Sequence, residues 1–227
     1  MNDRYPGTEL ELFAQARNWK SYIAGSLRPW LGPRVLEVGA GIGGNIPTMF
    51  TEPVREWTAL EPDPTLAARI EGASRVVIGT IEALDSSEEF DAVLYLDVLE
   101  HISEDHKEVE RALTHVAPGG RLIVLAPAHM FLFTPFDAAI GHYRRYNKRT
   151  LGTLPASDVT CAKLSYLDSV GLIASAANRF LLRSATPTPA QIAVWDRIMV
   201  PSSRWLDPLL VYSVGKSILG VWCKRRA

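Results

Sequence analysis

The stretch RVLEVGAGIGGN, residues 34–45, decides the fold of this chain. A short apolar run, Val35–Val38, leads into a turn with four glycines. Glycine adopts positive φ angles at no steric cost and lets a ligand lie against bare backbone. A glycine-rich turn directly after a buried strand is typical of nucleotide-binding α/β proteins. The stretch therefore predicts a strand, a ligand-binding turn and a following helix.

Four more short apolar runs follow this stretch, and segments with helical patterns separate them. Because apolar residues occupy successive positions in each run, both faces of each strand are expected to be buried. This indicates a parallel sheet covered by helices, that is, an α/β fold. Two later runs, Val159–Leu167 and Ser217–Cys223, are expected to be the last strands. The four earlier runs are WTALEP (57–62), RVVIGT (75–80), DAVLYLDVL (91–99) and RLIVLAP (121–127).

Helical patterns flank and interrupt these strands. Residues 9–27 carry apolar side chains at spacings of three and four, which predicts one amphipathic helix. Between the last two strands, helices are expected at residues 168–182, 189–200 and 207–214, with Asp207 as the N-cap of the third. We expect a single domain, residues 1–227, with four parts. These are an N-terminal helical segment (1–33), a cofactor-binding core (34–128), a lid segment (129–150) and a helical insertion (168–215).

The composition argues against several classes of protein. The chain has 227 residues, of which 47% are apolar and 22% charged, and its net charge is −1. These values are ordinary for a globular domain, and so small a charge creates no field that attracts nucleic acid or an anionic membrane. Cys161 and Cys223 belong to no CxxC or Cys/His cluster, so we expect free thiols and no metal site. No signal peptide or spanning segment is recognised, which predicts a cytoplasmic protein without stable membrane association.

Three acidic residues at strand ends indicate which nucleoside the glycine turn binds. Glu61 ends the second strand, where a carboxylate can accept both ribose hydroxyls of an adenosine. Glu37, before the turn, and Asp97, after the fourth strand, add negative charge to the same edge. Such charge suits the ammonium and sulfonium groups of S-adenosylmethionine, and it would repel the pyrophosphate of a dinucleotide, which prefers a helix N-terminus. The pattern therefore favours S-adenosylmethionine.

In this order, the motifs resemble those of the class I S-adenosylmethionine-dependent methyltransferases. The resemblance covers residues 34–150 and rests on VLEVGAGIGGN, ALEPDP, GTIEAL, FDAVLYLDVLEHI and VAPGGRLIVLAPA. The later segment GHYRRY, residues 141–146, is similar to a broad bacterial subgroup of the family. The resemblance implies a Rossmann-like three-layer sandwich, with a mostly parallel seven-stranded sheet and an antiparallel last strand. The family joins its last two strands by a short hairpin, so residues 168–215 imply a helical insertion.

The resemblance also implies which residues hold the cofactor. The glycine turn passes beneath the methionine part, the acid that ends the second strand binds the ribose, and residues after the third strand hold the adenine edge. Where the family often has Asp in that last place, this chain has Thr80, so Thr80, the Ile81 backbone or Glu82 is expected to serve. The implied cofactor-binding residues are Glu37, Gly39, Ala40, Gly41, Gly43, Asn45, Glu61, Pro62, Thr80, Ile81, Glu82, Asp97 and Val98.

The segment after the fifth strand supplies candidates for the acceptor side. Methyl transfer from a sulfonium is an in-line displacement that requires alignment, and an alcohol or amine acceptor also needs a base. Paired arginines could grip an anionic acceptor, or they could instead tie the segment to the insertion through ion pairs. His101 could also pack beneath the cofactor. The candidate catalytic residues are His142, His129 and Tyr146, and the candidate acceptor contacts are His101, Tyr143, Arg144 and Arg145.

We therefore expect S-adenosylmethionine-dependent methyl transfer to a small-molecule or peptide acceptor, such as one that carries a carboxylate, without a metal. Two alternatives remain open: a nicotinamide-dependent oxidoreductase, and a module that binds S-adenosylmethionine without catalysis. A nucleic-acid methyltransferase is disfavoured by the net charge. It is also disfavoured by LDVLEH, residues 96–101, which stands where such enzymes carry an Asn/Asp-Pro-Pro-aromatic motif.

Overall fold

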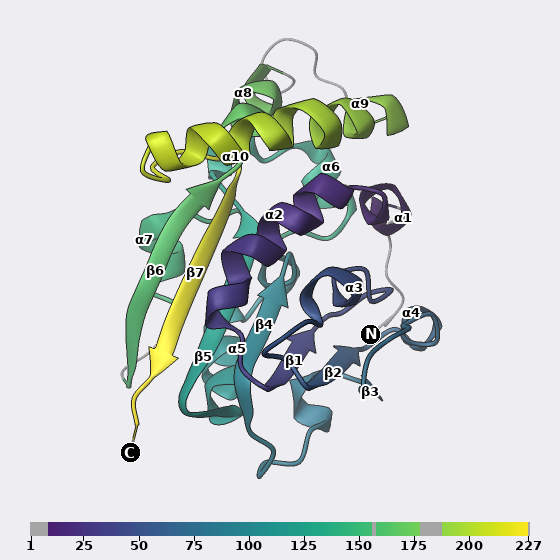
Figure 1. Cartoon of the computed structure of the whole chain (residues 1–227), viewed down its shortest axis with the longest axis vertical. Helices are drawn as coiled ribbons and strands as arrows, with labels where there is room; N and C mark the ends of the chain where they lie inside the picture. Colours follow the sequence, from purple (N-terminus) through teal and green to yellow (C-terminus); the bar gives the residue numbers. More distant parts are fainter. Residues whose placement is uncertain (1–8, 156–157, 178–187, 227) are drawn as a thin grey trace.

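The computed structural model describes residues 9–155, 158–177 and 188–226, and seven strands in these residues form one sheet. They are β1 (Arg34–Val38), β2 (Glu56–Glu61), β3 (Arg75–Ile78), β4 (Phe90–Leu96), β5 (Val116–Pro127), β6 (Val159–Leu167) and β7 (Ser217–Lys224). Their order across the sheet is β3-β2-β1-β4-β5-β7-β6 (Figure 1). Strands β1 to β5 pair in parallel, and β7 is antiparallel to both β5 and β6. The expected Rossmann-like fold class is confirmed.

Helices cover both faces of the sheet and the edge at which the parallel strands end (Figure 1). Many of them are short. The helical elements are α1 (Glu9–Ala14), α2 (Arg17–Leu27), η1 (Arg28–Trp30), α3 (Ile46–Met49), α4 (Pro64–Ala67), η2 (Ile81–Ala83), η3 (Leu99–His101), α5 (Asp105–Thr114), η4 (Met130–Leu132), α6 (Pro135–Ala139), α7 (Lys148–Gly152), α8 (Ser169–Ala177), α9 (Pro189–Val194), the π-helix η6 (Trp195–Met199) and α10 (Val200–Leu209).

Successive residues of the central strand β4 belong to two different cores. Ala92 and Leu94 pack in the core that includes buried residues of α2, whereas Val93 and Tyr95 pack in the core that includes buried residues of α5. Side chains alternate across a strand, so a strand covered by helices on both faces needs apolar residues at every position. This three-layer arrangement explains the unbroken apolar run of β4 and brings the ends of β1, β2 and β4 together at one edge. The expectation of two buried faces is wrong for β3, which lies at the edge of the sheet and leaves Val76 and Ile78 exposed.

The insertion between β6 and β7 is anchored by two buried aspartates. Asp207 accepts hydrogen bonds from the backbone N–H groups of Asp168 (2.7 Å) and Ser169 (3.0 Å), and from the Tyr22 hydroxyl of α2 (2.6 Å). Asp168 accepts one from the Trp195 indole at 2.7 Å. Figure 1 shows α10 running across the end of the molecule where β6 stops and β7 starts. The insertion therefore sits at the same edge as the ligand-binding turn.

Two predicted helices differ from the structure. The helix expected over residues 9–27 is divided into α1 and α2. The helix expected over residues 207–214 does not form as a separate element: residues 207–209 are the end of α10, in which the helix expected over 189–200 continues, and the Asp207 carboxylate is buried in tertiary hydrogen bonds instead of starting a helix. The helix expected over 168–182 is described as α8, and the remainder of that prediction, residues 178–182, lies outside the described residues.

Both cysteines are free, as expected, although Cys161 on β6 and Cys223 on β7 lie close along paired strands. Every helix in the described part of the chain is too short or too polar to cross a lipid bilayer.

Candidate functional site

A cleft of about 900 Å³ opens at the edge where the parallel strands end. Its walls come from the glycine turn after β1, from the ends of β2 and β4, from the N-terminal helices, and from the segment around α6. The insertion adds Trp195 and the neighbouring Lys216. The residues predicted from the sequence that line it are Gly39, Ala40, Gly41, Asn45, Glu61, Pro62, Thr80, Asp97, Val98, His101, His142, Tyr143 and Arg145.

The glycine turn is bound to the end of β2 and leaves no room for a side chain at its start. The N–H groups of Gly39 and Ala40 donate to the Leu60 carbonyl at 2.8 and 3.0 Å. Gly39 has a φ of 68°, and a Cβ there would lie 2.7 Å from Val98 Cγ2. Gly41, with a φ of 56°, needs the same backbone freedom. Bare backbone therefore forms this wall of the cleft.

Glu61 is oriented by the turn that it faces. Its Oε2 accepts the Gly41 N–H at 2.8 Å, and its Oε1 accepts the Asp63 N–H at 3.0 Å. Burial raises the pKa of Glu61 above its usual value, although both backbone hydrogen bonds oppose the shift. A carboxylate has about four lone-pair sites, so two remain for further donors. This geometry suits a pair of vicinal hydroxyls.

Glu37 lies beneath the turn and does not line the cleft. Its carboxylate accepts the Asn45 amide at 2.8 Å and the Trp57 indole at 3.2 Å, and Asn45 does line the cleft. Burial raises the pKa of Glu37 to about 7, against the effect of these hydrogen bonds and of nearby Lys20. Glu37 can therefore act on a bound ligand only indirectly, by holding the side chain of Asn45.

The residues after β3 divide between cleft, core and surface. Thr80 lines the cleft, Ile81 is buried in the core, and Glu82 is exposed and pairs with Arg111 at 3.0 Å. Gly43, with a φ of 73°, faces Ile70 and does not line the cleft. The structure therefore brings Thr80, and neither Ile81 nor Glu82, to the ligand wall.

Asp97 directly follows β4 and has a left-handed backbone conformation, with a φ of 56°. Its N–H donates to the Leu125 carbonyl at 2.8 Å, and its side chain meets solvent in the cleft while protein surrounds its other sides. Desolvation raises the pKa of Asp97 to about 6, and the charges of His142, Lys216 and Arg145 limit that rise. A cationic ligand group beside Asp97 would be stabilised by its carboxylate.

Asp137 of α6 organises the GHYRRY segment on the other side of the cleft. Its Oδ1 lies 3.0 Å from His142 Nδ1 and accepts from Arg145 Nε at 2.9 Å, and its Oδ2 accepts from the Thr134 hydroxyl at 2.8 Å. Burial alone would raise the pKa of Asp137, but these partners lower it to about 2. The His142 ring and the Arg145 guanidinium are therefore held by a charged carboxylate.

Three other predicted residues do not line the cleft. Arg144 pairs with Asp105 at 2.7 Å and also donates to the Ser103 carbonyl, and the Tyr146 hydroxyl donates to Asp105 at 2.8 Å. His129 Nε2 lies 3.0 Å from the Gly215 carbonyl, and its ring stacks on Tyr166. The ion pairs that the sequence analysis considered exist, but Arg144 and Arg145 reach Asp105 of α5 and Asp137 of α6, not the insertion.

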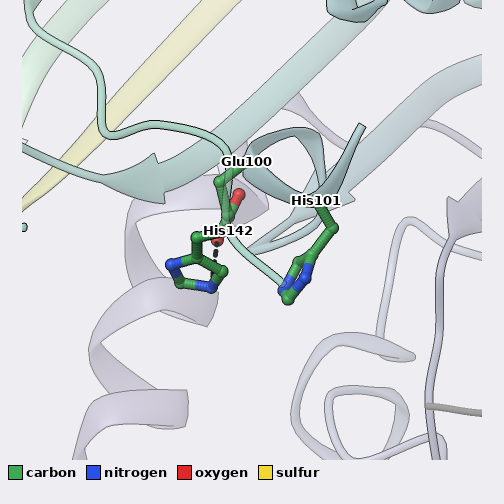
Figure 2. Close-up of side chains that lie close together, drawn as sticks. All are labelled: Glu100, His101 and His142. Atoms are coloured by element: carbon green, nitrogen blue, oxygen red, sulfur yellow. Dashed lines mark ion pairs between the residues drawn. The ribbon is translucent and has the colours of Figure 1, made fainter. Parts of the chain in front are cut away.

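The structure also assembles a group that the sequence analysis did not anticipate. Glu100, His101 and His142 each present a ligand atom, and these atoms all lie within 4.8 Å of one another (Figure 2). Neither Glu100 oxygen has a hydrogen-bond partner in another described residue, although the residue is only 1% exposed. Burial and Asp97 raise the pKa of Glu100 well above its usual value, and burial and His142 lower that of His101 to about 4. The separation of Glu100 and His142 in sequence concealed the cluster.

Comparisons with known proteins identify the family of the chain. A family model described as a methyltransferase domain matches residues 9–167. A ubiquinone biosynthesis O-methyltransferase from Azorhizobium caulinodans is 35% identical over 109 residues, which are 44% of this chain and 43% of the relative. The match thus spans less than half of that relative's length.

Solved structures share the fold at low sequence identity. A chain of the complex between the Haloferax volcanii Trm112 methyltransferase activator and a methyltransferase is 13% identical, with a TM-score of 0.67 over 99% of this chain and 97% of that one. A methyltransferase from Archaeoglobus fulgidus, described as dependent on S-adenosylmethionine, is 15% identical, with a TM-score of 0.59 over 96% of this chain and all of that one. Since the family model covers most of the chain, the chain belongs to the methyltransferase domain family.

Proposed function

We propose that this protein transfers the methyl group of S-adenosylmethionine to a hydroxyl oxygen of a small molecule that binds beside His142. One observation carries the proposal: a single cleft joins the glycine turn and Glu61 to the His142–Asp137 pair. The first part fits a nucleoside, and the second fits an acceptor that must lose a proton.

The cofactor end of the cleft has a suitable group for each part of the ligand. The bare backbone of Gly39 to Gly41 fits the methionine part, with Asp97 as the partner for its ammonium group. Glu61 would accept the two ribose hydroxyls, since its carboxylate is already turned into the cleft by Gly41 and Asp63. When bound, S-adenosylmethionine supplies a methyl group on positively charged sulfur.

His142 is the group at the acceptor end that can act on a hydroxyl. When its Nδ1–H donates to Asp137, Nε2 carries a lone pair. This nitrogen can hold the acceptor hydroxyl or take its proton, while Asp137 fixes the ring and favours the imidazolium. The arrangement supports an oxygen acceptor that needs activation over a carboxylate, which is already ionised.

The walls near His142 favour an apolar acceptor. Phe136, Ile140 and Tyr143 line this end of the cleft. Arg145 lines it as well, but Asp137 already binds its guanidinium, so an anionic acceptor would have to compete for it. The matched relative is named as an O-methyltransferase of ubiquinone biosynthesis, which also supports an oxygen acceptor.

A turnover assay tests this proposal. The purified chain is incubated with S-adenosylmethionine and, in turn, simple phenols and catechols, aromatic carboxylic acids, and a short peptide, and S-adenosylhomocysteine is measured. We expect product with phenols or catechols. Product with only carboxylic acids or the peptide would overturn the hydroxyl assignment, and cofactor binding without turnover on any acceptor would favour a non-catalytic module. Thermal stabilisation by NAD in place of S-adenosylhomocysteine would overturn the cofactor itself.

A further inference from the structure

We propose that Glu100, His101 and His142 bind a divalent transition-metal cation at the acceptor end of the cleft. The binding of the metal is argued from these residues alone. Its role in holding the acceptor rests on the proposed function.

The three side chains offer a typical set of metal ligands. Glu100 and His101 are consecutive in η3, and His142 comes from the loop after α6, so that Figure 2 shows them side by side. Two imidazole nitrogens and one carboxylate oxygen suit Zn²⁺ and similar cations, with bonds of about 2.0–2.2 Å. Two atoms bound to one such cation lie about 3–4 Å apart. His142 Nε2 and Glu100 Oε1 are 3.9 Å apart, within this range.

The buried carboxyl group of Glu100 needs a group that pairs with it or binds it. Its carboxyl group is buried, and no other described residue hydrogen-bonds either oxygen. The 3.9 Å to His142 Nε2 is too long for a hydrogen bond. Buried carboxyl groups are normally paired, hydrogen-bonded or coordinated to a metal, because desolvation is costly. A cation between Glu100 and His142 satisfies both groups at once.

The residues behind the histidines fit the same interpretation. A histidine that ligates a metal usually donates its other ring N–H to a carboxylate or a backbone carbonyl, which fixes the tautomer. His142 Nδ1 lies 3.0 Å from Asp137, a carboxylate that Arg145 and Thr134 also hold. His101 makes a hydrogen bond to the backbone of Ile140. Both rings therefore have the orienting contact that ligands need.

The position of the cluster indicates a working site. All three residues line the cleft, so a cation held by three protein ligands keeps at least one coordination position open to it. A hydroxyl bound at that position has a lowered pKa and a fixed direction. With the cation present, His142 would act as a ligand, and the cation would take over the activation of the acceptor oxygen, whose proton would pass to water in the open cleft.

Direct metal binding tests the site without any assay of activity. The full chain is stripped with a chelator and titrated with Zn²⁺ in a calorimeter, and Co²⁺ is added separately to record its visible absorption. We expect one Zn²⁺ per chain, binding tighter than Mg²⁺, and a Co²⁺ spectrum that indicates nitrogen ligands. Glu100→Gln and His142→Ala should each weaken Zn²⁺ binding by at least about tenfold. His106→Ala, which changes an exposed histidine, should leave it unaltered.

Each outcome bears on one proposal. If Zn²⁺ fails to bind, if His142→Ala binds it as well as the wild type, or if Mg²⁺ binds equally tightly, the metal site is overturned. In those cases the proposed function still stands if S-adenosylhomocysteine binds and phenols are methylated after chelation. If Zn²⁺ binding depends on the cluster but no acceptor is methylated, the metal site stands and the proposed function falls. Thermal unfolding of each variant shows whether Glu100→Gln or His142→Ala is folded, and a variant that is unfolded is replaced by Asp137→Asn, for which about tenfold weaker binding is expected.

Discussion

The two ends of the cleft are built in different ways. At the cofactor end, backbone groups of a few consecutive residues form the wall: the N–H groups of Gly39 and Ala40 donate to the Leu60 carbonyl, and the Gly41 N–H donates to the Glu61 carboxylate. At the acceptor end, side chains from η3, α6 and the GHYRRY segment meet around Asp137 and Glu100. A site formed by the backbone of consecutive residues can therefore be predicted from the sequence, whereas a site formed by side chains that are distant in sequence cannot.

The largest effect is expected where the backbone wall is disturbed. Gly39→Val places a Cβ 2.7 Å from Val98 and forces a branched residue to a φ of 68°. We expect a loss of about 3 kcal/mol in the free energy of unfolding and no measurable cofactor binding. Urea denaturation and calorimetry with S-adenosylhomocysteine measure both. Gly25→Ala, in α2 with open space around it, is the control: it should leave cofactor binding unchanged and, as a helix-interior substitution, raise the free energy of unfolding by up to about 1 kcal/mol. A Gly39→Val protein that binds normally would show that the backbone wall is not tightly packed.

The second prediction concerns Glu37, the buried acid beneath the cofactor end of the cleft. The pKa of Glu37 is about 7 in the folded chain, against 4.5 for the ordinary group. Between these values the folded state binds more protons than the unfolded state, so this group's contribution is fully present below pH 4.5 and is lost as pH rises through 7. The free energy of unfolding should fall by about 3 kcal/mol over this interval. Urea denaturation of Glu37→Gln should lack that fall, whereas Glu56→Gln, at an exposed position, should retain it. If the free energy of unfolding depends on pH equally in both variants, the raised pKa of Glu37 is contradicted.

A smaller effect is expected for the ribose contact. Glu61→Ala removes the carboxylate that faces the cleft, and a charge-assisted pair is worth roughly 1.5–3 kcal/mol. Calorimetry should show S-adenosylhomocysteine binding weakened by about tenfold or more. Glu82→Ala is the matched control, because Glu82 is exposed and pairs with Arg111 outside the cleft. Unchanged affinity in Glu61→Ala would remove Glu61 from the site.

The last pair of variants separates catalytic from structural residues at the acceptor end. His142→Ala should lower turnover by at least about tenfold, or 1.4 kcal/mol, with little change in cofactor affinity. Arg144→Ala should instead lower the free energy of unfolding by about 1 kcal/mol and keep activity per folded molecule, because Arg144 pairs with Asp105 away from the cleft. Steady-state kinetics and urea denaturation distinguish them. If His142→Ala lowers only the free energy of unfolding, the GHYRRY segment has a structural role and the acceptor binds elsewhere.

Particular residues show how far prediction from sequence reaches. The strand Val159–Leu167 was predicted with the bounds that the structure has, and Glu61 was predicted opposite the glycine turn, because both depend on local pattern and sheet geometry. Asp207 shows the opposite. Its sequence context favours a helix N-cap, but its carboxylate is buried against Asp168 and Tyr22, and these tertiary hydrogen bonds override the local signal.

The acceptor side shows the same limit. Arg145 was predicted either to hold an anionic acceptor or to form an ion pair with the insertion, and it pairs instead with Asp137, a residue that nothing in the sequence singled out. Glu100 follows a strand like many helix-start acids, and only the position of His142 reveals that its carboxyl group faces a histidine. Such pairings depend on how loops cross, which residue spacing does not encode.

By itself, the sequence determined the alternation of buried strands and helices, the glycine turn and the acid that faces it, since each follows from periodicity, from backbone freedom at glycine and from the meeting of parallel strands at one edge. Only the tertiary structure decided which polar side chains satisfy one another and which face the cleft. The physical reason is that burial makes an unpaired charge costly, and its partner is whichever group the completed fold brings within a few ångströms.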